Sequence, residues 1–147
     1  METSGRQSMR RIVVGARPQG EEPWVLKAAA ELAHQTGAEL VVISVDELET
    51  EKLSAVPRSE FTARAEQAAA EAVERLREAG IEATMEVRAG RPFEQIIGFA
   101  DEQDADLIVV GTSSRGRLAS AVLGSVPLSL VRSSRRPVLV VSAPESG

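Results

Sequence analysis

The chain has 147 residues, of which 43% are hydrophobic, 27% charged and 3% aromatic, with a formal net charge of −5. This length suits a single domain with one core. The absence of cysteine excludes disulfides, zinc–thiolate sites, iron–sulfur clusters and cysteine nucleophiles, and the scarcity of aromatic rings argues against binding of single-stranded nucleic acid.

The absence of cysteine, of a membrane-spanning run and of a signal peptide suggests a cytoplasmic protein. No apolar run approaches the roughly 20 residues needed to cross a bilayer, and the polar opening lacks the hydrophobic stretch of a signal peptide. We expect residues 1–10 to form a disordered tail and residues 11–143 to form the folded domain. Residues 1–106 hold 12 basic and 21 acidic residues, whereas residues 107–147 hold 5 and 1. This asymmetry argues against general nucleic-acid binding and places positive potential near the C-terminus.

Five short runs rich in valine and isoleucine predict β-strands. They cover residues 12–16, 40–45, 84–87, 107–110 and 138–141. The first, second and fourth are continuously apolar, the pattern of parallel strands covered by helices on both faces. Residues 84–87 alternate between apolar and polar, which favours an edge strand.

Four segments with apolar residues at helical spacing separate these strands, each marked by a proline near its start or a glycine at its end. They begin at Pro23, near Ser59, at Pro92 and after Gly124. Regular alternation of strand and helix specifies a parallel sheet with right-handed crossovers and helices on both faces. Ligands in such folds bind beyond the carboxyl ends of the strands, where the strand order reverses. We interpret the acidic residues 46–59 as a mobile loop beside that position.

The segment GTSSRGRLASAVLGSVP, which begins at Gly111, gives the best indication of a ligand site. Its glycines allow backbone N–H groups to approach a ligand, and the hydroxyls of Thr112 and Ser114 can donate to oxygens. Ser125 begins a helix whose N-terminus favours anions. These features predict a phosphate site. The plainer alternative is a strand-to-helix turn with Ser125 as an ordinary N-cap.

The sequence resembles the universal stress protein family over nearly its whole length. The segments RIVVGA, ELVVISVDE, GRPFEQI, ADLIVVGT and RRPVLVV carry the likeness. After the fourth strand the family has Gly, two residues, Gly, nine residues, and Gly followed by Ser or Thr, and Gly111, Gly124 and Ser125 match this spacing. For residues 11–143 we predict an α/β, three-layer, doubly wound, Rossmann-like domain. Its five-stranded parallel sheet has the strand order 3-2-1-4-5.

The resemblance also implies a nucleotide site, because the glycine loop holds the phosphates of ATP in the ATP-binding members. Val45 matches the family position whose backbone meets adenine. Arg115 lies beside the loop and could contact phosphate oxygens, although solvated arginines are more frequent. With ATP, a Mg or Mn ion would be expected. The candidate site residues are Ala16, Arg17, Val45, Gly111, Thr112, Ser114, Arg115, Gly124, Ser125 and Val126.

Two departures from the family pattern leave the function open. Ser114 replaces the second glycine, and Gly116 stands two residues later. Arg17 stands where ATP-binding relatives usually have an aspartate near the ribose and adenine. It replaces an acceptor with a long cation that could block the pocket or reach a phosphate. The chain is therefore predicted to be either a dimer that binds ATP or another phosphate ligand, or a dimeric protein-interaction module that does not bind ATP.

No catalytic or metal-binding constellation is recognisable in the sequence. His34 is the single histidine and falls near the end of a predicted helix, where interaction with the helix dipole explains it. Asp104 and Asp106 are interpreted as solvated loop residues. Neither a Walker-type lysine motif nor Gly-x-Gly-x-x-Gly after the first strand is present. We predict a protein that is not an enzyme.

The last predicted strand is very apolar for the edge of an open sheet, and such an edge invites pairing with another chain. We therefore predict a homodimer, in agreement with the family resemblance. The contact would be made by Val138, Leu139, Val140 and Val141.

Overall fold

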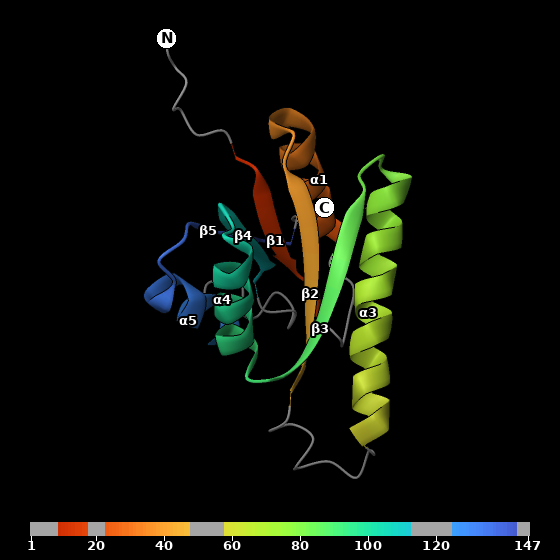
Figure 1. Ribbon diagram of the computed structural model, residues 1–147, viewed down its shortest axis with the longest axis vertical. Coiled ribbons are helices and arrows are strands. Elements are labelled where there is room, and N and C mark those ends of the chain that lie inside the picture. Colours follow the sequence, from red (N-terminus) through yellow and green to blue (C-terminus); the bar gives the residue numbers. More distant parts are fainter. Residues whose placement is uncertain (1–8, 18–22, 48–57, 113–124, 144–147) are drawn as a thin grey trace.

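The computed structural model describes residues 9–17, 23–47, 58–112 and 125–143. Figure 1 shows the elements in chain order: β1 (Arg11–Gly15), α1 (Pro23–Thr36), β2 (Glu39–Glu47), α3 (Arg58–Glu78), β3 (Ala83–Gly90), α4 (Pro92–Gln103), β4 (Leu107–Gly111), α5 (Ser125–Ser133) and β5 (Val138–Val141). The five strands form one parallel sheet in the order β3-β2-β1-β4-β5, which confirms the predicted architecture.

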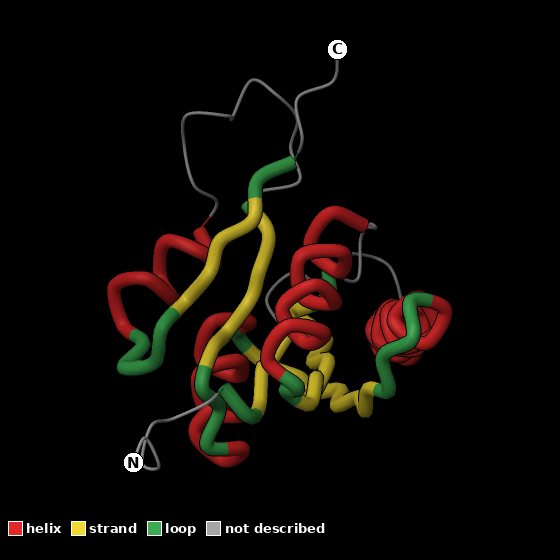
Figure 2. The backbone as a smooth tube through the Cα atoms, turned by 90° about the horizontal axis from the view of Figure 1, so that it is seen from above, coloured by secondary structure: helices red, strands yellow, loops and turns green. Residues whose placement is uncertain are grey.

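Helices cover both faces of this sheet, as Figure 2 shows. One core lies between the sheet and the pair α1 and α3, and the other between the sheet and the pair α4 and α5. Neighbouring residues of one strand face opposite cores, so that Val13 packs toward α4 and α5 while Val14 packs toward α1 and α3. Both valines are fully buried. Burial of both faces of the sheet explains why the sequences of the central strands are continuously apolar.

The second strand is longer than the sequence suggests. Its pairing with β3 continues through Asp46 opposite Ala89 and Glu47 opposite Gly90. Asp46 was expected in the acidic connection, but it is 3% exposed and accepts a hydrogen bond from the hydroxyl of Thr62 at 2.9 Å. A buried carboxylate with a partner on α3 belongs to the packed structure. The expected mobile loop falls mostly on residues 48–57, which lie outside the described residues.

The two C-terminal helices pack differently from each other. In α4, Ile96, Phe99 and Ala100 are buried. In α5, Leu130 is fully buried, whereas Leu128 and Val131 remain exposed. One narrow face of this short helix meets the sheet, so apolar residues on its other side stay outside the core. Within the described ranges, each helix is too short or too polar to span a bilayer.

Candidate functional site

The strand order reverses between β1 and β4. From β1 the chain crosses to β2 and β3 on one side, then returns to add β4 and β5 on the other side. The carboxyl ends of β1 and β4 therefore border the place where doubly wound sheets bind ligands. Ala16 and Arg17 follow β1 directly, Gly111 ends β4, and Thr112 comes next. The structure thus brings these four predicted site residues to one edge of the sheet.

The end of β1 is held firmly against its neighbours. The backbone N–H of Ala16 donates to the carbonyl oxygen of Ile43 at 2.8 Å, which continues the pairing with β2. A Cβ added to Gly15 would lie 3.1 Å from Cγ1 of Val110, tighter than ordinary van der Waals contact. The absence of a side chain here allows β1 and β4 to stay close. Arg17 therefore leaves the sheet from an anchored position.

Arg17 is half-buried and has no counter-charge among the described residues. Its Nε is buried without a hydrogen-bond partner there, and leaving a buried donor unpaired costs about 1–3 kcal/mol. The other half-buried arginines of the described ranges are Arg11, Arg88 and Arg136. Each of them lies within 2.9 Å of a carboxylate oxygen. Among the described residues, Arg17 thus adds a positive charge without an ion-pair partner at the carboxyl edge of β1.

The end of β2 places its side chains on two sides. Val45 is buried in the core beneath α4 and α5, and its backbone pairs with Arg88 of β3. Ser44 is fully buried, and its hydroxyl has no partner among the described residues. Neither the burial of Ser44 nor that of Asp46 was predicted from the sequence. Their spacing of two positions was the available signal, because it puts both side chains on the same face of a strand.

At the end of β4, the backbone N–H of Thr112 is already engaged. The amide of Thr112 donates to the carbonyl oxygen of Val141 at 3.1 Å and so extends the pairing with β5. Thr112 can therefore meet a ligand through its hydroxyl or carbonyl group. Ser125 begins α5, and Val126 packs beside the core beneath α4 and α5.

The remaining predicted contacts, Ser114, Arg115 and Gly124, lie outside the described residues. The phosphate site of the glycine loop therefore stays a prediction.

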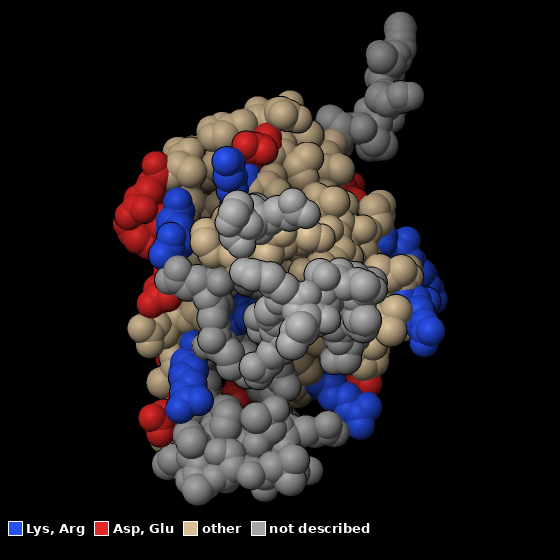
Figure 3. Space-filling view, turned by 180° about the vertical axis from the view of Figure 1, so that it is seen from behind, with Lys and Arg blue, Asp and Glu red and all other residues tan. Residues whose placement is uncertain are grey.

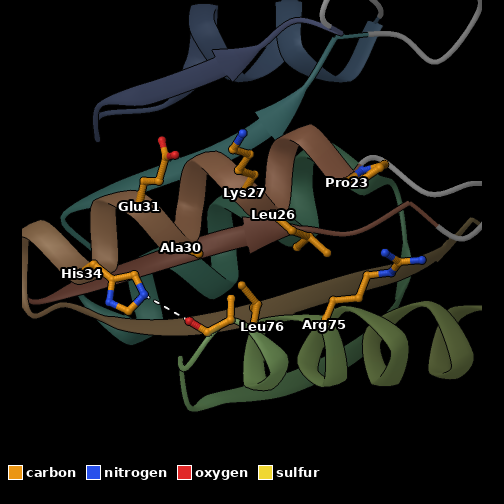
Figure 4. Close-up of a pocket in the computed structure, with 9 residues that line it drawn as sticks. Pro23, Leu26, Lys27, Ala30, Glu31, His34, Arg75 and Leu76 are labelled. Atoms are coloured by element: carbon orange, nitrogen blue, oxygen red, sulfur yellow. Dashed lines mark hydrogen bonds between the residues drawn. The ribbon is translucent and has the colours of Figure 1, made fainter.

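A separate pocket lies between α1 and the C-terminal part of α3, and Figure 4 shows the side chains that line it. Its volume is about 310 Å³. It is lined by Pro23, Leu26, Lys27, Ala30, Glu31, His34, Arg75, Leu76 and Ala79, none of which belongs to the predicted site. The Nε2 of His34 lies 3.1 Å from the carbonyl oxygen of Ala79, the contact drawn as a dashed line in Figure 4. His34 therefore links the end of α1 to the end of α3.

The two aspartates that precede β4 differ in their surroundings. Asp104 is exposed as predicted, but Asp106 is half-buried and accepts the backbone N–H groups of Arg10 and Arg11. The described residues contain no group of three or more acidic or histidine side chains suited to a metal ion. On the face shown in Figure 3, acidic and basic side chains of the described residues are interspersed.

Comparison with known proteins connects this geometry to a family. Residues 9–142 match the model of the universal stress protein family. The chain is 38% identical over 66 residues to one universal stress protein of Methanocaldococcus jannaschii, and 28% identical over 103 residues to another from the same organism. These matches cover 45% and 70% of this chain, but 39% and 60% of the two relatives.

Two similar solved structures contain nucleotides. The universal stress protein from Archaeoglobus fulgidus in complex with dAMP has a TM-score of 0.71 and 25% identity, over 92% of this chain and 99% of that one. A universal stress protein in complex with cAMP has a TM-score of 0.73 and 26% identity, over 94% and 100%. Both likenesses extend over nearly the whole domain.

Proposed function

The chain belongs to the universal stress protein family, and on that premise we propose that it is a non-catalytic stress-response protein that binds a nucleotide or another phosphate-bearing ligand. The ligand would lie across the carboxyl ends of β1 and β4. We further propose that the protein is cytoplasmic and homodimeric, and that ligand binding shifts the population of states presented to a partner.

The observation that supports this proposal most is that Arg17, at the strand-order reversal, has no ion-pair partner among the described residues. A half-buried guanidinium favours an anion there, and its planar fork can bind two phosphate oxygens at once. The nucleotide complexes of the two similar structures support the same chemistry. ATP with Mg or Mn is one candidate. Because the described residues offer no acidic or histidine cluster for a metal, we propose that such an ion would enter on the phosphates.

The alternative is a dimeric interaction module without ATP affinity. The engaged amide of Thr112 favours it, because one backbone donor beside the loop is already used by Val141. Arg17 favours it as well if its side chain fills the space that adenosine needs. Either function is compatible with the same fold and the same edge strand.

Denaturing the purified protein and analysing the released small molecules would separate the two functions, followed by calorimetric titration with ATP and Mg or Mn. We expect a bound nucleotide or a measurable affinity, and we expect Gly124→Ala to abolish it by obstructing the backbone approach. Gly98→Ala is the matched control, since a Cβ on Gly98 meets no atom within 4 Å. No released nucleotide and no titration signal would favour the interaction module. An unchanged affinity in Gly124→Ala would show that the site lies elsewhere.

A further inference from the structure

Arg17 carries information about which nucleotide the site accepts. A guanidinium has five donors and no acceptor, so it cannot receive a hydrogen bond from a ribose hydroxyl. It binds phosphate oxygens with paired, charge-assisted hydrogen bonds. Among the described residues no carboxylate neutralises Arg17 and its Nε lacks a partner. The ligand group beside it should therefore be an anion and not a free sugar hydroxyl.

The sheet geometry sets the spacing between the positions that a nucleotide could occupy beside Arg17. In the central strand, Ile12 pairs with Leu107 of β4 on one side and with Leu40 of β2 on the other. Neighbouring strands lie about 4.8 Å apart, a spacing comparable to the separation of phosphate, ribose and base within a nucleotide. We place the 5′-phosphate beyond β4, within reach of the hydroxyl of Thr112, and a nucleotide laid across the strand ends in this way has its ribose beyond β1. Arg17 is the residue that leaves β1 at that point.

We propose that this site selects nucleotides that carry a second phosphate on the ribose, at the 2′ or 3′ position, and that Arg17 binds this second phosphate. The inference rests on the proposed nucleotide-binding function and makes it more specific. The physical logic is that of dinucleotide-binding folds, where an acidic side chain accepts from a free 2′-hydroxyl and an arginine accommodates a 2′-phosphate. A nucleotide with an unmodified ribose has one phosphate-bearing end to offer to this cation, so it gains less from Arg17 than a nucleotide with a second phosphate.

The test compares AMP with adenosine 2′,5′-bisphosphate and adenosine 3′,5′-bisphosphate by calorimetric titration of the full chain. We expect at least one bisphosphate to bind about tenfold or more tightly than AMP, because its second phosphate adds a charge-assisted contact with Arg17. Arg17→Gln should abolish this preference, because it should weaken the binding of the bisphosphates about tenfold more than the binding of AMP.

Arg11→Gln is the matched control, because it removes the same charge from the opposite end of β1. There the arginine pairs with Glu39 at 2.9 Å, away from the carboxyl edge of the sheet. We expect it to leave the affinities for all three nucleotides unchanged. AMP binding as tightly as both bisphosphates, or an equal loss of all three affinities in Arg17→Gln, would overturn this inference and leave nucleotide binding intact. If neither ATP nor any of the three nucleotides binds the native chain, the proposed function fails with it.

Discussion

The Oδ2 atom of Asp106 lies 2.7 Å from the backbone nitrogen of Arg10, across 96 positions of sequence. The same oxygen accepts the backbone N–H of Arg11 at 3.0 Å. These two donors hold the pKa of the Asp106 carboxyl below its usual range. The carboxylate therefore ties the beginning of the central strand β1 to the connection between α4 and β4.

This arrangement predicts a stability contribution that depends on pH. The folded pKa of Asp106 lies below the unfolded value near 3.9. The contribution is therefore fully present above about pH 5 and is lost as the pH falls through the folded pKa. We expect Asp106→Ala to lower the free energy of unfolding at pH 7 by about 1–2 kcal/mol, and Asp106→Asn, which keeps an acceptor oxygen, to lower it by less. Urea denaturation at several pH values between 7 and 3 measures both effects.

Asp104→Asn is the control for that experiment. Asp104 has a left-handed backbone with φ of 53°, which asparagine tolerates, and its exposed carboxylate lies 3.4 Å from Arg136. We expect a change within about 0.5 kcal/mol. A difference between the native chain and Asp106→Asn that stays constant down to pH 3 would contradict the role given to the charge of Asp106.

Arg88 joins β3 to α4 and supports a second prediction. Its guanidinium lies 2.6 Å from Glu102 and 2.8 Å from Glu86, and its Cζ lies 4.9 Å from the centre of the Phe99 ring. Hydrogen bonds from Arg88 lower the pKa of the Glu102 carboxyl. We expect Arg88→Met to destabilise the fold by about 1 kcal/mol, measured by denaturant unfolding.

Added salt distinguishes the contributions within this cluster. Glu102 is exposed, so Glu102→Gln should lower the free energy of unfolding only slightly. This small loss should fade in about 0.5 M salt, because salt screens surface ion pairs. The contact of Arg88 with the Phe99 ring is more sheltered and should persist. If salt abolishes the whole effect of Arg88→Met, the ring contact contributes nothing measurable.

Gly90, just before α4, and Gly98, within α4, should respond to alanine in opposite directions. Gly90 has φ of +141°, a conformation that side chains rarely adopt, so Gly90→Ala should destabilise the fold by about 1–3 kcal/mol. The nearest atoms belong to the flexible side chain of Gln95, so the backbone conformation is the main cause. Gly98 lies within the helix with open space around it, and Gly98→Ala should stabilise by about 0.5–1 kcal/mol. Paired urea unfolding curves test both, and shifts in the same direction would refute the explanation.

Most of the fold was predictable because the elements are marked locally. Val13 and Val14 show the limit of that information, since both are apolar and the register of the sheet decides which core each joins. The true end of β2 was missed because Asp46 looks like a loop residue until its partner Thr62 is known. The polar sequence at Asp46 favoured a loop, but its pairing with β3 and its hydrogen bond with Thr62 extend the strand through this residue.

The sequence indicates which residues border the strand ends, but it does not indicate the contacts that determine their chemistry. Arg17 could be identified from its position after the first strand. Its lack of a carboxylate partner among the described residues depends on which distant segments the fold brings near it. Likewise, the engagement of the Thr112 amide by Val141 follows from the register of β4 and β5. No short motif encodes such relationships, because each joins residues far apart in the chain.

The edge strand β5 supports the prediction of a homodimer. It ends the sheet, and Val138 and Val140 pack toward the core beneath α4 and α5, while Leu139 is 37% exposed. An apolar edge strand with an exposed leucine favours pairing with a second chain, and a lysine there opposes it. We expect the native chain to sediment as a dimer at micromolar concentration and Leu139→Lys to sediment as a monomer. Leu128→Lys should remain dimeric, because Leu128 is similarly exposed at 39% but lies on α5. A monomeric native chain would refute the prediction, and dissociation caused by Leu128→Lys alone would move the interface from β5 to α5.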